Sequence, residues 1–298
     1  MKLLLINLCL LTFLINNAYS NSSRTLDFIL IKNRIVIKVE SNNVVYKLLF
    51  DTGSNISIID SIKASQLNLP FLMQTGIPTP GGITKASFTK FDLFKEFNIS
   101  WAIASLNNLS PLRKYKIDGL LGVKDILMNS VLGIDFKNKK IHISYPDQAI
   151  DKKFHSISLK NGNRSQDSGL GRFFSALPVF EGNIIFEDNK SERVDLFIDT
   201  GCHYNFAVIT QDSSVIKSYT NKSKEYYLFN GSKRLISFGN VSINGFIKSN
   251  RAEVPFFYDP FFLKIHENEL IALLGVPFLK KYKNIIINWP ERVVNFKK

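Results

Sequence analysis

The sequence predicts a mostly β fold made of two similar halves. Short runs of alternating apolar residues dominate, helical patterning is scarce, and a pair of motifs recurs about 150 residues apart. The chain has 298 residues and is 45% hydrophobic, so it can bury a sizeable core. Its length suits one large domain or two of ordinary size.

Residues 1–20 are expected to form a signal peptide. Lys2 supplies a positive charge, residues 3–14 are almost wholly apolar, and Ala18-Tyr19-Ser20 offers small residues where a signal peptidase reads them. The apolar run is shorter than the ~20 residues of a membrane span, although an uncleaved anchor is the alternative. We therefore expect a secreted protein, or a periplasmic one if the source is a Gram-negative bacterium.

Composition and cysteine count limit the other function classes. The formal net charge is +13, but the basic residues are scattered and no nucleic-acid motif occurs, so no nucleic-acid partner is expected. Cleavage after residue 20 would leave Cys202 as the sole cysteine, which excludes a disulfide within the chain. The four histidines have no metal-ligand spacing, and we expect no metal or cofactor.

The elements of the first half follow from alternation and turn residues. Residues 29–39 are expected to form a strand interrupted at Asn33, and 44–50 a second strand after a turn at Ser41-Asn42-Asn43. Further strands are expected at residues 56–59, 85–91, 99–104 and 140–144, and helices at 61–67 and 125–131. Polar residues around 146–172 predict a linker. The expected organisation is an N-terminal lobe at 21–150, a linker at 151–176 and a C-terminal lobe at 177–298.

Two motifs recur together at matched distance. Phe50-Asp51-Thr52-Gly53 matches Ile198-Asp199-Thr200-Gly201, and Gly119-Leu120-Leu121-Gly122 matches Ala272-Leu273-Leu274-Gly275. The step from Asp51 to Leu120 is 69 residues, and the step from Asp199 to Leu273 is 74. The segments that follow, 133–144 and 287–296, also correspond. One Asp-Thr-Gly is a weak signal, but the repeated pair is a strong one.

The motif pair suits carboxylate chemistry. An apolar strand precedes Asp51 and Asp199, and the glycine two residues later permits a sharp, closely approaching turn. Two such loops face to face would bring two carboxyls about 3 Å apart, where they hold one proton between them. The ionised member can then take a proton from water while the other polarises a carbonyl group. The Leu-Leu-Gly strands would support the two loops from beneath.

These motifs resemble the pepsin-like and retropepsin-like aspartic peptidase clan, and each half resembles the bacterial retropepsin-like type. The resemblance spans about residues 29–296 and includes Asp51-Thr52-Gly53-Ser54, Asp118-Gly119-Leu120-Leu121-Gly122, residues 64–69 and residues 275–282. It implies a bilobal β fold with an active-site cleft that binds an extended protein or peptide substrate. It also implies that Asp51 and Asp199 are catalytic, that Thr52 and Thr200 bond across the lobe junction, and that one chain acts as a monomer.

A flap over the cleft is expected at residues 79–84, where Gly81, Gly82 and Ile83 form the tip of a hairpin. An ordinary surface hairpin is the alternative. The pepsin-like flap carries a tyrosine, and none occurs between Asp51 and Trp101. Residues 229–232 hold the corresponding place in the second half.

The two dyad loops differ at one position. Ser54 follows Gly53, and its hydroxyl is expected to donate to the Asp51 carboxylate, whereas Cys202 follows Gly201 and is a weaker donor. We expect Asp199 to be held less firmly. One hypothesis is that Cys202 makes activity sensitive to thiol modification, and the alternative is that this position tolerates sequence drift. His203 is a further departure. The expected function is aspartic endopeptidase, and the alternative is a catalytically inactive relative that binds peptides.

Overall fold

The computed structural model describes residues 23–79, 82–97, 99–106, 115–128, 130–144, 155–160, 177–210, 213–219, 222–227, 233–244, 248–258 and 270–298. Most of these residues lie in strands and the helices are short, so the prediction of a mostly β protein is confirmed. The expected signal peptide lies outside the described residues. No helix in the described ranges combines the length and hydropathy that crossing a bilayer requires.

The first half begins with three antiparallel strands joined by tight turns: β1 (Arg24–Ile31), β2 (Arg34–Ser41) and β3 (Val44–Asp51). Asn42 and Asn43 have φ of 51° and 61°, and they form the expected turn between β2 and β3. Lys32 and Asn33 also have positive φ, of 49° and 56°. The expectation of one strand at 29–39 is therefore wrong, because the chain reverses at the residue that interrupts the alternation.

The remaining elements of the first half follow in the order β4 (Ser57–Asp60), α2 (Ser61–Gln66), β5 (Met73–Thr79), β6 (Gly82–Thr89), η1 (Asp92–Phe97), β7 (Trp101–Ala104), β8 (Gly119–Gly122), α4 (Lys124–Leu127), β9 (Val131–Asp135) and β10 (Lys140–Ser144). The helix expected at 125–131 is shorter than predicted. It ends at Leu127, and Val131 begins β9 because its side chain packs into the core of that sheet.

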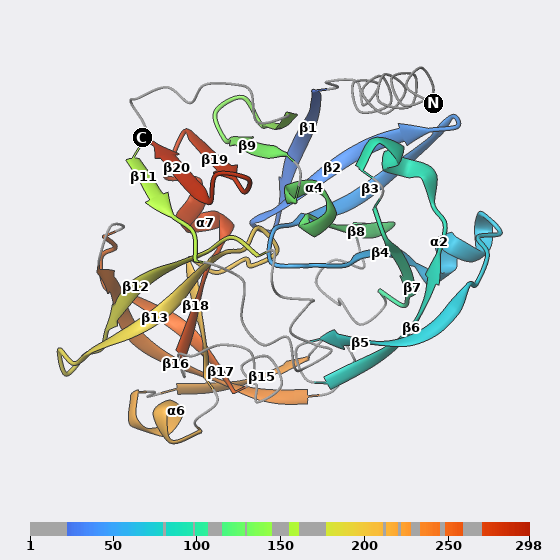
Figure 1. The fold of residues 1–298 in the computed structure, drawn as a ribbon. Helices are drawn as coiled ribbons and strands as arrows, with labels where there is room; N and C mark the ends of the chain where they lie inside the picture. The colour runs from blue at the N-terminus through green and yellow to red at the C-terminus, as the bar shows by residue number, and fades with distance from the viewer. Residues whose placement is uncertain are drawn as a thin grey trace, which may run out of the picture.

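The second half contains β11 (His155–Ser158), β12 (Val179–Ile185), β13 (Ser191–Ile198), β14 (Phe206–Thr210), α6 (Ser213–Tyr219), β15 (Lys222–Tyr227), β16 (Lys233–Asn244), β17 (Ala252–Tyr258), β18 (Leu270–Leu274), α7 (Val276–Leu279), β19 (Asn284–Asn288) and β20 (Val293–Lys297). In Figure 1 most first-half strands lie on the right, and the yellow and orange strands β12–β18 lie at the lower left.

The two halves share one strand topology. The first half runs β2-β3-β8-β4-β7-β6-β5 across its sheet, and the second runs β12-β13-β18-β14-β17-β16-β15. The directions agree as well, since β3–β8 and β13–β18 are parallel pairs, whereas β4–β8 and β14–β18 are antiparallel. The repeat seen in the motifs therefore extends to the arrangement of the strands.

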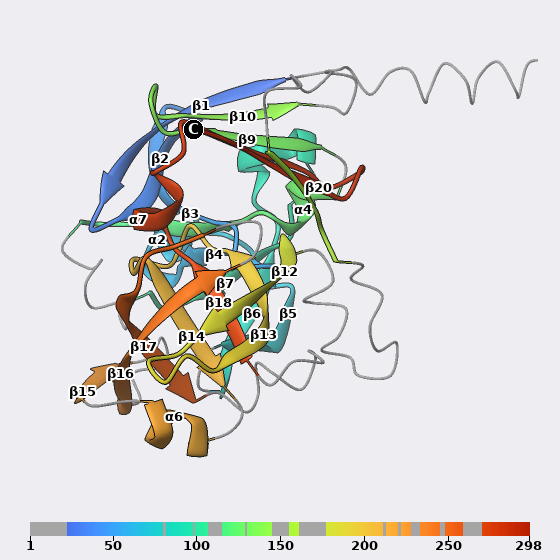
Figure 2. The same cartoon turned by 90° about the vertical axis from the view of Figure 1, so that its left-hand side faces the viewer.

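Strands from both halves meet in a shared sheet with the order β11-β20-β19-β9-β10-β1. At its centre β19 pairs with β9, so the end of the chain is hydrogen-bonded to the first half. Figure 2 shows β1, β10, β9 and β20 side by side at the top of the molecule. β11 lies inside the stretch expected to be a linker. Residues 155–158 form a strand because β20 offers a free edge, and the following Leu159 is buried.

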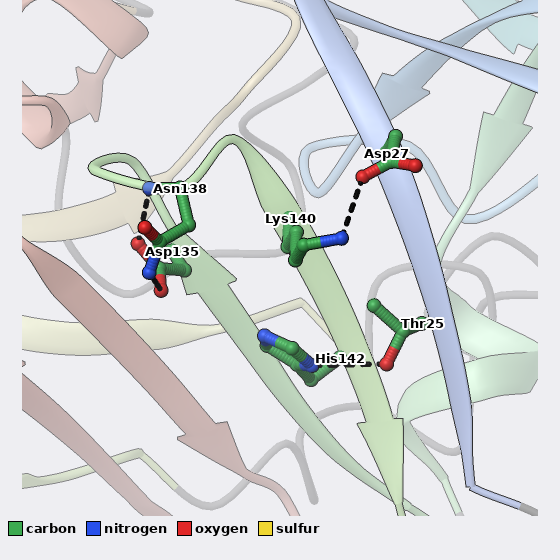
Figure 3. Close-up of polar contacts among 6 residues, drawn as sticks. All are labelled: Thr25, Asp27, Asp135, Asn138, Lys140 and His142. Carbon is green, nitrogen blue, oxygen red and sulfur yellow. Dashed lines mark hydrogen bonds and ion pairs between the residues drawn. The ribbon is translucent and has the colours of Figure 1, made fainter.

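The strands put apolar residues inward and polar residues outward, as their alternation requires. In β2, Ile35, Ile37 and Val39 are buried in the core. On the shared sheet Lys140 pairs with Asp27, and Thr25 Oγ1 lies 3.1 Å from His142 Nδ1, both at the surface. Figure 3 shows these contacts beside the Asp135–Asn138 turn between β9 and β10. The shared sheet thus has one buried and one polar face.

Candidate active site

Two buried strands deliver Asp51 and Asp199 to the junction between the halves. Asp51 is the last residue of β3, and Asp199 directly follows β13. The Leu-Leu-Gly strands lie beside them: β8 pairs in parallel with β3, so that Gly122 is opposite Asp51, and β18 pairs with β13, so that Leu274 is opposite Ile198. Both motifs of each half therefore meet at its aspartate.

The two loops approach so closely that each glycine lies against the other loop's carboxyl. A Cβ atom built on Gly53 would be 2.7 Å from Asp199 Cγ, and one built on Gly201 would be 2.5 Å from Asp51 Oδ2. Side-chain carbons do not tolerate such distances, so a larger residue at either position would displace the opposing carboxyl. The structure thereby brings together two aspartates that are 148 residues apart in the chain.

The two threonines hold the loops together through a symmetric set of hydrogen bonds. Thr52 Oγ1 donates to the Ile198 carbonyl at 2.7 Å, and Thr200 Oγ1 donates to the Phe50 carbonyl at 2.7 Å. Each hydroxyl also accepts from the other threonine's backbone N–H at 3.0 Å. Both threonines are fully buried, so these four bonds lie away from solvent. The bonds expected across the junction are present.

Backbone N–H groups bind both carboxylates. Gly53 N–H donates to Asp51 Oδ1 at 2.8 Å. Asp199 Oδ1 accepts from Gly201 N–H at 2.8 Å and from Cys202 N–H at 3.0 Å. Such bonds favour the ionised form of a carboxyl group.

The pair is arranged to hold one proton. Each aspartate keeps some exposed surface but is otherwise enclosed by protein. Burial raises the pKa of both carboxyls, and the neighbouring charge of Asp199 raises that of Asp51 further, well above its usual range. The interaction between the two side chains couples their titration, so that one carboxyl holds a proton while the other is ionised. The two carboxyls therefore share one proton, and the additional backbone hydrogen bond to Asp199 favours Asp199 as the ionised member.

Ser54 and Cys202 occupy equivalent places, but neither side chain donates to a carboxylate. Ser54 Oγ donates to the Ile56 carbonyl at 2.9 Å, and Cys202 Sγ lies 3.8 Å from the Tyr204 carbonyl. The expectation that Ser54 bonds to Asp51 is wrong, because its hydroxyl stabilises the turn that follows. Asp199 also accepts one more of these backbone bonds than Asp51, so the expectation that Asp199 is held less firmly is not supported.

Arg34 is a site residue that the sequence did not reveal. It begins β2 and is buried, with 7% of its surface exposed. Its Nε donates to the Gly201 carbonyl at 3.1 Å, and its Nη2 lies 2.9 Å from His203 Nδ1. The first half thus reaches into the Asp199 loop. The signal lay in the strand register: continuing the pairing Val36↔Leu49 by two residues puts Arg34 opposite Asp51.

The flap candidates lie on a hairpin formed by β5 and β6, in which Thr79 pairs with Gly82. Gly82 and Ile83 belong to β6, whereas Gly81 lies outside the described residues. In the second half β15 and β16 form the corresponding hairpin, in which Tyr227 pairs with Lys233. Its expected tip at 229–232 also lies outside the described residues.

Within the described ranges, no group of three or more His, Cys, Asp or Glu side chains is placed to hold a metal ion. Comparison of the sequence with models of protein families and with curated proteins finds no match in either.

Proposed function

We propose that this protein is an aspartic endopeptidase of the pepsin-like and retropepsin-like clan. The observation that carries the proposal is the mutual approach of the two Asp-Thr-Gly loops, in which each glycine lies against the other loop's carboxyl. Enclosing two carboxyls side by side costs stability, because like charges repel and burial disfavours the ionised form. A purely structural role does not require such an arrangement. A pair that shares one proton is suited to general acid–base catalysis.

The proposed reaction is the hydrolysis of a peptide bond by a bound water. Asp199 takes a proton from the water as its oxygen attacks the scissile carbonyl carbon, and Asp51 gives its proton to the carbonyl oxygen. The resulting gem-diol collapses when Asp51 takes back a hydroxyl proton. Asp199 then protonates the leaving nitrogen as the C–N bond breaks. Both carboxyls return to their starting protonation states, so the reaction needs only the peptide and water.

The proposal includes a two-lobed architecture and an extended protein or peptide substrate bound between the lobes. Its support is the shared strand topology of the halves and the position of the dyad loops where those halves meet. A single chain provides both aspartates, and we accordingly propose a monomeric enzyme. Secretion remains a prediction from residues 1–20.

The test is peptide cleavage by the mature chain across pH 3–8, using a diverse peptide library. The parent should cleave, and Asp51→Asn and Asp199→Asn should each lower turnover by at least ~10³-fold, because neither variant keeps an acid and a base. Asp27→Asn, which changes an exposed carboxyl on the shared sheet, is the matched control and should retain activity. A statine-type inhibitor, whose hydroxyl replaces the bound water, should block the parent.

Two outcomes would reject the proposal that this protein is an aspartic endopeptidase. Cleavage that persists in both asparagine variants would show that another group does the chemistry. Absence of cleavage by the parent, combined with saturable binding of peptides, would favour the alternative of an inactive peptide-binding relative.

A further inference from the structure

We propose that Arg34 is a positioning residue for the dyad, acting as a one-sided brace between the first half and the Asp199 loop, and that the brace holds only while His203 is uncharged. This inference rests on the proposed function for its catalytic consequence. The brace itself rests on hydrogen bonds between the two halves, so it can also be tested without substrate.

The brace has two contacts on the Asp199 loop and one on its own turn. The Arg34 guanidinium donates from Nε to the Gly201 carbonyl at 3.1 Å and contacts His203 Nδ1 through Nη2 at 2.9 Å. A third donor, Nη1, lies 3.4 Å from the Lys32 carbonyl. Gly201 is the residue that lies against the Asp51 carboxyl, so Arg34 fixes the backbone at a point where the two loops approach closely.

The chemistry of the contact defines the state of His203. Arginine has only donors, so Nδ1 of His203 must accept, which places the imidazole proton on Nε2. A protonated imidazole has no acceptor and would oppose the guanidinium charge. Burial and Arg34 lower the pKa of His203 from 6.5 to about 4, in agreement with a neutral ring. The ring of Tyr204 lies 4.0 Å from that of His203 between centroids, and Asp199 and Cys202 belong to the same loop.

The brace is one-sided because the repeat breaks at this position. In the second half, continuing the pairing Val179↔Phe197 by two residues puts Leu177 opposite Asp199, where Arg34 stands opposite Asp51. The counterpart of His203 is Asn55, whose side-chain N and O are buried without a hydrogen-bond partner. The strand topology of the halves is otherwise closely matched. Arg34 in place of Leu177 therefore gives the two carboxyls unequal surroundings.

Arg34 also acts on the dyad through its charge. No carboxylate among the described residues lies within ion-pair distance of Arg34, yet its charge lowers the pKa of both Asp51 and Asp199. Removing the charge would raise both values and move the active pH range upward. Keeping the charge but losing the planar set of donors would loosen the Gly201 backbone without moving that range.

The experiment compares Arg34→Gln, Arg34→Lys and His203→Asn in the full mature chain, using the peptide that the parent cleaves fastest. Arg34→Gln should lower kcat/KM by about 10- to 100-fold and move the pH profile to higher pH. Arg34→Lys should lower kcat but keep the profile in place. Below about pH 4 the activity of His203→Asn should fall less steeply with pH than that of the parent. The variant lacks the imidazole whose protonation would break the contact with Arg34.

The control is Arg251→Gln, which removes a guanidinium that donates to the Phe186 carbonyl and the Asn189 side chain. An Arg34→Gln variant with parental rate and pH profile, or an Arg251→Gln variant with the same shift, would overturn the proposal. The thermal midpoint Tm from pH 3 to 7 is the readout without substrate. His203→Asn should reduce the fall of Tm on acidification, and an unchanged fall would reject the brace even if the parent proved to have no peptidase activity.

Discussion

Glycine at two positions decides whether the two carboxyls can meet. Gly53 and Gly201 each leave room for the opposing aspartate, and in both cases the neighbouring atoms belong to the reacting group itself. A methyl group at either position would displace the opposing carboxyl from its reacting position. If that carboxyl did not move, the loops would separate and the hydrogen bonds of Thr52 and Thr200 would be strained.

We therefore expect Gly53→Ala to lower kcat/KM by at least ~100-fold, because a displacement near 1 Å at a catalytic group has that order of effect. Gly133→Ala in β9 is the matched control, since its Cβ would meet His142 Cβ at an ordinary 3.5 Å. Steady-state kinetics on both variants measures the effect. Equal activity of Gly53→Ala and the parent would mean that the loops do not approach as described.

Cys202 is a structural thiol, and its reactivity should be low. It is 8% exposed, and burial raises the pKa of its thiol far above the usual range. Only the thiolate attacks alkylating reagents. The earlier expectation that thiol modification inhibits the protein is thus not favoured by the structure.

Iodoacetamide at pH 7.5 should leave Cys202 unmodified in the native protein and label it after unfolding in urea. Mass analysis of the proteolytic fragment that contains Cys202 distinguishes these outcomes and separates it from Cys9. Rapid labelling of the native protein, with parallel loss of turnover, would restore the original expectation.

At the scale of single residues, the sequence predicts the site residues that belong to a repeated motif. Asp51, Thr52 and Gly53, with their counterparts, are examples. Arg34 could not be found in this way because an arginine at the start of a strand is common. Its position became meaningful only when the register placed it opposite Asp51 and the fold brought the Asp199 loop within reach.

Among the elements, β11 connects the shared sheet to the strand that carries Asp199. It pairs with β20, and Lys160, two residues beyond its end, forms an ion pair with Asp195 in β13. The Asp195 side chain is 4% exposed. Removing one partner of a buried ion pair is costly, because the remaining charge loses part of the compensation for its desolvation.

Lys160→Met should accordingly lower the free energy of unfolding by about 3 kcal/mol. The matched control is Lys190→Met, which breaks a surface pair with Asp188 and should cost about 0.5 kcal/mol or less. Urea unfolding followed by circular dichroism gives both values. Equal small losses would indicate that the ion pair with Asp195 contributes little and that β11 is held by its strand pairing alone.

β11 also shows where element prediction fails. Its sequence has one apolar residue, Ile157, within a polar stretch, which is too short a pattern to distinguish a strand from a linker. Tertiary pairing with β20 decides the outcome. The turn at Lys32 and Asn33 was missed for a related reason, because apolar residues continue on both sides of it and only the left-handed backbone reveals the reversal.

For the whole molecule, the enclosed dyad links stability to pH. The folded-state pKa of Asp51 is raised well above its ordinary value, so the folded protein keeps a proton that the unfolded chain releases. This contribution favours the folded state below the ordinary carboxyl range and is lost as the pH rises through the folded-state pKa. Enclosing the dyad therefore makes the protein less stable at neutral pH.

Asp51→Asn should be more stable than the parent by about 1–2 kcal/mol at pH 7, since catalytic sites are often built at the expense of stability. The difference should shrink toward pH 4, where the parent carries the proton. Asp27→Asn, at the surface, should show no such gain. Unfolding in urea at pH 4, 5.5 and 7 measures the trend, and a variant less stable than the parent at pH 7 would contradict it.

The mostly β class follows from alternation, and the two-fold organisation follows from the motif repeat. The sheet that joins the halves could not be predicted, because nothing in residues 284–288 specifies pairing with β9 rather than with a nearer strand. Such long-range pairings depend on how complete sheets fit together. They are therefore found in the structure and not in local sequence patterns.

The pairing of β19 with β9 has a consequence for biosynthesis. β19 begins 149 residues after β9 ends at Asp135, so the shared sheet can close only after all the strands from β10 to β18 have been synthesised. The Asp199 loop likewise meets the Asp51 loop only when both halves have folded. A nascent chain that has not yet reached β19 would therefore lack the closed shared sheet, and any hydrolytic activity that depends on this sheet would be delayed.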